Sequence, residues 1–145
     1  MVGFALIAAH AESNACSCAA GPSITDRERV ARNYENSQLV GVFEVVGSKR
    51  SVVIGGKRLK GRFAVLNPGH VFKGVIFSGQ TFYASLGGTN TSCEVNFEKG
   101  TLILVYANRT EPIEIGFCGI SGRLEGALRD IRYLFEITEP QIPRE

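Results

Sequence analysis

Apolar residues along the chain fall into short runs with strand-like composition. The run Leu39–Val46 is rich in β-branched and aromatic residues with little polar interruption, which predicts a mostly buried strand. Alternation over Arg58–Val65 predicts a second strand, and glycines at positions 47, 55 and 56 indicate a turn region between the two. Asn67-Pro68-Gly69 predicts a kink or bulge, because proline is poorly tolerated inside a paired strand. Shorter strands are predicted at Thr81–Leu86, Thr101–Tyr106 and Pro112–Phe117.

A helix is predicted at each end of this series of strands. Thr25-Asp26-Arg27-Glu28 has the form of a capping box, and the helix that it opens is expected to end near Asn36. Over Ser121–Phe135 the spacing changes to that of a helix, with Leu124, Leu128, Ile131 and Phe135 on one face. The order helix, five short strands, helix predicts a mainly β fold, a small five-stranded Greek-key barrel.

The N-terminal region is typical of an exported protein. Residues 1–15 contain a short apolar run followed by small residues at Ser13 and Ala15, which predicts a signal peptide cleaved before Cys16. A lipid anchor on Cys16 is the alternative, and no later segment is apolar enough to span a membrane. The domain is therefore expected over residues 16–138, with a loose, proline-broken tail over 139–145. The net charge of +2 is too small to indicate nucleic acid as a partner.

Four cysteines in an exported chain predict two disulfides. A bridge between Cys16 and Cys18 would strain the backbone, so each of them is expected to pair with Cys93 or Cys118. Two pairings remain open at this level. A zinc site is disfavoured, because only one closely spaced cysteine pair is present.

The order of these features resembles a known family. An N-terminal Cys16-Ser17-Cys18 precedes a helix that leads into SQLVGVFEVVG, and a second strand ends in HVFKG. Thr91-Ser92-Cys93 closes the next loop, TLILVYA follows, and Cys118 precedes the last helix. The chain resembles the N-terminal inhibitory domain of the tissue inhibitors of metalloproteinases, in the netrin-like group of OB-fold barrels. With four cysteines and no cysteine-rich second domain, it is most similar to the single-domain, bacterial-type members.

The resemblance implies a function for the N-terminus. It implies disulfides Cys16–Cys93 and Cys18–Cys118, and a secreted monomer that inhibits a zinc metalloprotease without being an enzyme or needing a cofactor. The α-amine and carbonyl of Cys16 would bind the zinc of the target in trans, as a compact bidentate ligand at an open metal position. A protease-binding ridge is implied, made of Cys16, Ser17, Cys18, Ala19, Thr91, Ser92 and Cys93. The protein would act outside the cell, or in the periplasm or at the surface of a bacterial host.

Two alternatives use other parts of the chain. Six basic residues are expected on one hairpin, as a solvated surface or as a site for a sulfated polyanion: Lys49, Arg50, Lys57, Arg58, Lys60 and Arg62. The same fold could also serve as a secreted interaction or scaffold module without inhibitory activity. Catalysis is not expected, because the chain contains no metalloprotease, serine hydrolase or P-loop motif, and His70 has no free thiol partner if all four cysteines are paired.

Overall fold

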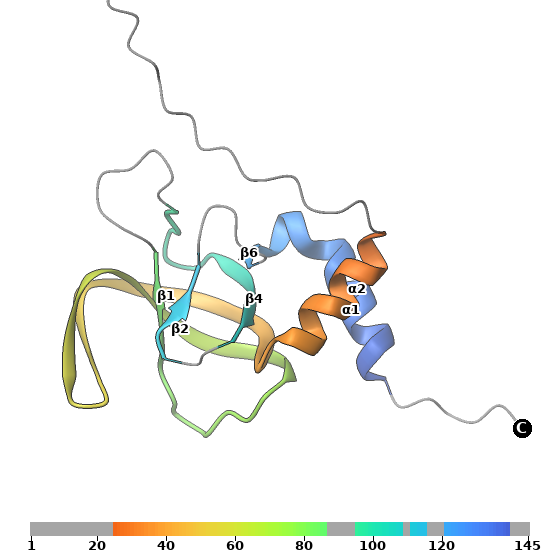
Figure 1. Ribbon diagram of the computed structural model, residues 1–145. Coiled ribbons are helices and arrows are strands. Elements are labelled where there is room, and N and C mark those ends of the chain that lie inside the picture. The colour runs from red at the N-terminus through yellow and green to blue at the C-terminus, as the bar shows by residue number, and fades with distance from the viewer. Residues whose placement is uncertain (1–24, 87–94, 109–110, 116–120, 140–145) are drawn as a thin grey trace, which may run out of the picture.

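A computed structural model describes residues 25–86, 95–108, 111–115 and 121–139 (Figure 1). The described part begins with helix α1 (Asp26–Asn36) and the two long strands β1 (Leu39–Ile54) and β2 (Lys57–Lys73). The remaining elements are β3 (Phe82–Ser85), β4 (Leu102–Ala107), β5 (Ile113–Glu114), β6 (Gly122–Arg123), the 3-10 turn η1 (Leu124–Ala127) and α2 (Leu128–Thr138). None of the helices in these ranges is long and apolar enough to cross a membrane.

The strands form one six-stranded mixed sheet in the order β5-β3-β2-β1-β4-β6. All neighbours are antiparallel except β3 and β5, which are parallel. The two helices lie side by side next to the sheet (Figure 1). The predicted mainly β fold with a helix at each end is confirmed. The sheet has six strands where five were expected, and among the described residues β5 and β6 are not paired with each other, so no closed barrel is seen.

Strands β1 and β2 are much longer than predicted. Gly47 lies within the ladder opposite Val65, so the turn expected at this position is wrong. The reversal occurs only at Gly55 and Gly56, whose φ angles of 58° and 74° are readily adopted by glycine. Register shifts bend the two strands at several points, including the stretch of β2 just after Pro68. The bulge predicted at Asn67-Pro68-Gly69 is therefore confirmed.

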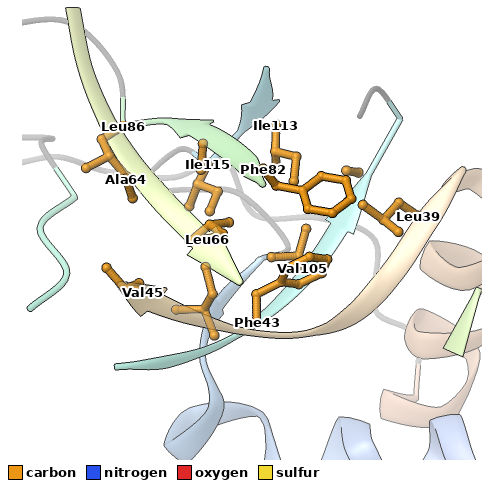
Figure 2. Close-up of a cluster of buried hydrophobic side chains, with 13 residues drawn as sticks. Leu39, Phe43, Val45, Ala64, Leu66, Phe82, Leu86, Val105, Ile113 and Ile115 are labelled. Atoms are coloured by element: carbon orange, nitrogen blue, oxygen red, sulfur yellow. The ribbon is translucent and has the colours of Figure 1, made fainter. Parts of the chain in front are cut away.

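Two layers of apolar side chains hold the fold together. The larger cluster fills the concave side of the sheet, with residues from β1 to β5 that include Phe43, Leu66 and Phe82 (Figure 2). The smaller one lies between the opposite side of the sheet and the helices, and contains Val30 of α1 and Leu134 of α2. Strand β4 contributes alternate residues to both clusters. This explains why its sequence is continuously apolar rather than alternating.

Helix α1 begins as predicted. The hydroxyl oxygen of Thr25 accepts a hydrogen bond from the Glu28 backbone N–H at 3.3 Å, and the Glu28 carboxylate accepts one from the Thr25 backbone N–H at 2.9 Å. This reciprocal pair is the predicted capping box, and the helix ends at Asn36 as expected.

The second helix starts later than predicted and buries a different face. The segment expected to be helical from Ser121 first forms β6 and the 3-10 turn, so α2 begins only at Leu128. Leu128 and Phe135 are 63% and 43% exposed, whereas Asp130 and Leu134 are buried. The apolar face predicted from the spacing is therefore only partly covered, because Ile131 packs against the smaller cluster whereas Leu128 and Phe135 are exposed.

Candidate functional site

The residues of the expected protease-binding ridge lie outside the described part of the chain. They are Cys16, Ser17, Cys18, Ala19, Thr91, Ser92 and Cys93, together with Cys118, residues 1–15 and most of the predicted tail. The structure does describe the ends of β3 and β5, which precede the segments containing Cys93 and Cys118 in the sequence.

These two segments start from neighbouring strands. In the parallel pair β3–β5, Ala84 lies opposite Ile113 and Ser85 lies opposite Glu114. The Ile115 backbone N–H donates to the Ser85 carbonyl oxygen at 3.1 Å, which continues the pairing to the last described residue of the β5 segment. The segment 87–94 follows Leu86 in the sequence and the segment 116–120 follows Ile115, and these two described residues lie at the same edge of the sheet. Parallel pairing requires this, because it places the carboxyl ends of both strands at one edge.

A buried polar cluster fixes the two helices to the sheet. The Arg29 guanidinium donates to both oxygens of the Asp130 carboxylate, at 3.0 and 2.6 Å. The Tyr106 hydroxyl, from β4, donates to the same carboxylate at 3.3 Å. Asp130 is only 6% exposed, and each of its oxygens has a donor. The cluster joins α1, α2 and β4, and this satisfied arrangement is structural in character.

The Tyr106 phenol makes this cluster sensitive to alkali. Burial, and then the neighbouring Asp130 carboxylate, raise the pKa of Tyr106 well above its ordinary value of 10.0. The unfolded chain loses this proton near pH 10 and the folded protein keeps it, so stability from this group is complete below pH 10 and declines above it. Between pH 9 and pH 11 the free energy of unfolding should fall by about 1.4 kcal/mol through Tyr106 alone.

Urea unfolding of the wild type and of Tyr106→Phe over this pH range tests the effect. The variant should lose less stability between pH 9 and pH 11, because all other titrating groups are common to both proteins. Parallel stability curves would show that the phenol contributes nothing to the alkaline loss.

The predicted basic hairpin is confirmed, and it forms a distinct surface. The outer half of the β1–β2 ladder, residues 48–63, is here called the basic arm, and it contains all six predicted cations (Figure 1). Ser51 pairs with Lys60 and Val53 with Arg58, while Lys49 pairs with the buried Phe63. Directly opposite residues lie on one face of a ladder, and alternate residues of β1 share that face. One face of the arm, here called the cationic face, therefore carries Lys49, Ser51, Val53, Arg58 and Lys60.

Acidic side chains are absent from this part of the sequence. No Asp or Glu occurs between Glu44 and Glu94, a stretch that contains all six cations of the basic arm. Lys49, Arg50, Lys57, Arg58 and Lys60 make no ion pair with any residue that the structure describes. Their positive charge is therefore not neutralised within the described chain. The prediction rested on the six cations alone, and this interval without acids is a further signal for the arm in the sequence.

A pocket of about 290 Å³ lies at the base of the arm. Lys49, Arg50 and Arg62 provide its cations, and Arg62 also donates to the side-chain oxygen of Asn96. Its apolar lining comes from Phe63, Leu86 and Phe97. Asn96 and Phe97 were not predicted as site residues, since they reach the arm from a loop more than thirty positions away. Only the fold brings them there.

Other candidate chemistry is sparse in the described ranges. His70 is exposed and contacts the rings of Phe72 and Phe135, at centroid distances of 4.6 and 5.2 Å. A second pocket, of about 550 Å³, lies between the end of β4 and the start of α2 and is lined in part by Leu102 and Leu128. No group of three or more His, Cys, Asp or Glu side chains in the described residues is arranged to hold a metal ion.

The chain matches no protein-family model and no curated protein. Its function must therefore be argued from its own residues. Two features of the described residues bear on function: the edge at which β3 and β5 end, and the basic arm with its pocket.

Proposed function

We propose that the protein is a secreted inhibitor of a zinc metalloprotease, built on a netrin-like OB-fold barrel. In this proposal the mature chain begins at Cys16, and two disulfides, Cys16–Cys93 and Cys18–Cys118, hold its N-terminus against the barrel. The observation that carries it is the parallel pairing of β3 with β5. This pairing starts the Cys93 and Cys118 segments from adjacent strands, which favours bridges from both to the closely spaced Cys16 and Cys18.

The connectivity of the sheet supports the proposed barrel. Strands β3, β2, β1 and β4 form a continuous antiparallel series with β3 and β4 at its two edges. Strand β5 pairs with β3, and β6 pairs with β4, although β5 and β6 are separated by only eight positions. We infer that β5 and β6 together take the place of a fifth strand between β3 and β4, which would make five strands in an OB-fold order. The large apolar cluster, which includes residues of β1 to β5, is what the interior of such a barrel requires.

The chemistry at the N-terminus follows from its free amine. An α-amine has a pKa of about 7.7–8.0, so a lone pair is available to zinc near neutral pH. The amine and carbonyl of Cys16 would together displace the catalytic water from the open position of the metal. Two disulfides would fix this group before binding, which reduces the entropy lost on association.

The remaining ridge residues would make the contacts around the metal. Ser17 would enter the specificity pocket beside the zinc, and Ala19 would follow along the cleft of the protease. Thr91 and Ser92 would form the adjoining part of the ridge, joined to the N-terminus through Cys93.

The alternative is a secreted interaction or scaffold module that uses the same barrel without binding zinc. Both functions need the disulfides, so the disulfides do not separate them. The position of the mature N-terminus does, because only the inhibitor requires a free amine on Cys16.

Intact-mass and N-terminal analysis of the exported protein therefore tests the proposal. We expect a chain that starts at Cys16 and is four mass units lighter than its fully reduced form, because each of the two disulfides removes two hydrogens. A mature chain that starts at Ala15, or one that carries an acyl group on Cys16, would exclude zinc binding by the amine.

A further inference from the structure

We propose that the basic arm and the pocket at its base form a binding site for a sulfated polysaccharide. This site is separate from the proposed protease-binding ridge and does not depend on it. The proposal rests on three features of the described residues: unneutralised charge along one face, a small pocket with a cationic rim, and few exposed aromatic side chains.

The positive charges of the cationic face lie in a row along the strands rather than at a single point. Lys49 and Val53 are four positions apart on β1, so the cationic face extends about 13 Å along the strand. Arg58 and Lys60 lie on the opposing strand of the same face, and all three cations are exposed. Lys57 and Arg50 add positive charge on the other face. A linear anion with charges repeated along its length fits such a row better than a single phosphate does.

The pocket adds a site for one unit of that polymer. Its volume of about 290 Å³ is at the small end for ligand pockets and suits a single sugar ring. Phe63, Leu86 and Phe97 give it apolar walls for the C–H face of a ring, while Lys49, Arg50 and Arg62 lie where sulfate groups would project. The Lys49 ammonium lies 5.7 Å from the centre of the Tyr83 ring, a cation–π contact that limits the positions open to this side chain.

Other polyanions fit the surface less well. OB folds and similar proteins bind single-stranded nucleic acid by stacking bases on aromatic side chains. The one aromatic residue of the arm is Phe63, which lies opposite Lys49 on the cationic face, and at 4% exposed its ring offers no surface for stacking. A membrane surface would require apolar side chains that insert between lipids, and Val53 is the one large apolar residue of the arm that is strongly exposed. Sulfated polysaccharide is the class that needs charge without stacking or insertion.

The experiment titrates a fluorescent heparin octasaccharide into the full chain at 50 and 150 mM salt. The test variant is Lys49→Ser/Arg58→Ser/Lys60→Ser, and the control is Arg32→Ser/Lys99→Ser/Arg132→Ser, which removes the same charge from exposed positions outside the arm. We expect the test variant to weaken binding at least tenfold and to reduce its salt dependence, and the control to change binding no more than twofold.

Three results would overturn the proposal. If both triple variants weakened octasaccharide binding equally, binding would depend only on the net charge of the protein. Equal or tighter binding of a single-stranded DNA oligonucleotide, or of vesicles containing anionic phospholipid, would assign the arm to those partners. If a desulfated octasaccharide bound as tightly as the sulfated one, the site would not recognise sulfate groups. Thermal unfolding checks that the variants are folded, and Lys60→Glu alone, expected to weaken binding about threefold, gives a second test if the triple variant unfolds.

Discussion

If the proposed function holds, the mature protein extended by one alanine ahead of Cys16 should lose inhibition of a zinc metalloprotease. The extension moves the α-amine away from the Cys16 carbonyl and converts the nitrogen of Cys16 into an amide, which is a poor metal ligand. The chelating pair is then lost as a unit. We expect the inhibition constant to rise at least 100-fold, which corresponds to about 2.7 kcal/mol of binding free energy.

The matched control carries the same alanine after Glu145. Both proteins should unfold at nearly the same temperature, because the extension adds no buried group. Inhibition is measured against a panel of zinc endopeptidases whose metal has an open, water-bound position. Equal inhibition constants for the two extended proteins would exclude chelation by Cys16. A mature chain that inhibits none of the panel would favour the interaction module instead.

Replacing Phe43 by alanine should produce the largest loss of stability among single changes in the sheet. Phe43 is fully buried in the large core cluster, and its ring meets that of Phe82 edge to face with centroids 5.4 Å apart. Removing a buried phenylalanine costs about 3–5 kcal/mol through lost transfer free energy and the cavity left behind. A domain of this size has a total stability of roughly 5–15 kcal/mol, so the variant should be close to unfolding.

Phe77→Ala provides the control, because Phe77 is 72% exposed on the segment between β2 and β3. Urea unfolding should show a change within about 0.5 kcal/mol for this substitution. The comparison tests the proposed barrel interior as well as the core. If Phe43→Ala cost no more than Phe77→Ala, the β1–β5 cluster would not be the main source of stability.

Local signals in the sequence identified the elements well. The capping box at Thr25 and the apolar run from Leu39 correctly located the start of α1 and of β1. The failures came from interactions between distant positions. Gly47 looked like a turn residue, but pairing with β2 carries the strand through it. Tertiary pairing overrides local propensity in such cases.

The C-terminal helix shows the same limit more clearly. Periodicity favoured a face through Leu128 and Phe135, yet the helix buries Asp130 instead. A buried aspartate is stable here only because Arg29 and Tyr106 donate hydrogen bonds to it, and Arg29 is 101 positions away in the sequence. The pocket beside the basic arm was missed for a similar reason, since Phe97 reaches it from a separate loop.

The packing of the first described helix against the last also dictates when the domain can be completed. Helix α1 leaves the ribosome before all the strands, whereas its partner α2 follows them in the sequence. Until α2 has formed, Leu104 and Tyr106 on the helix-facing side of β4 are not packed against it. A nascent chain stalled before Asp130 would therefore expose apolar surface that favours aggregation until α2 has been synthesised.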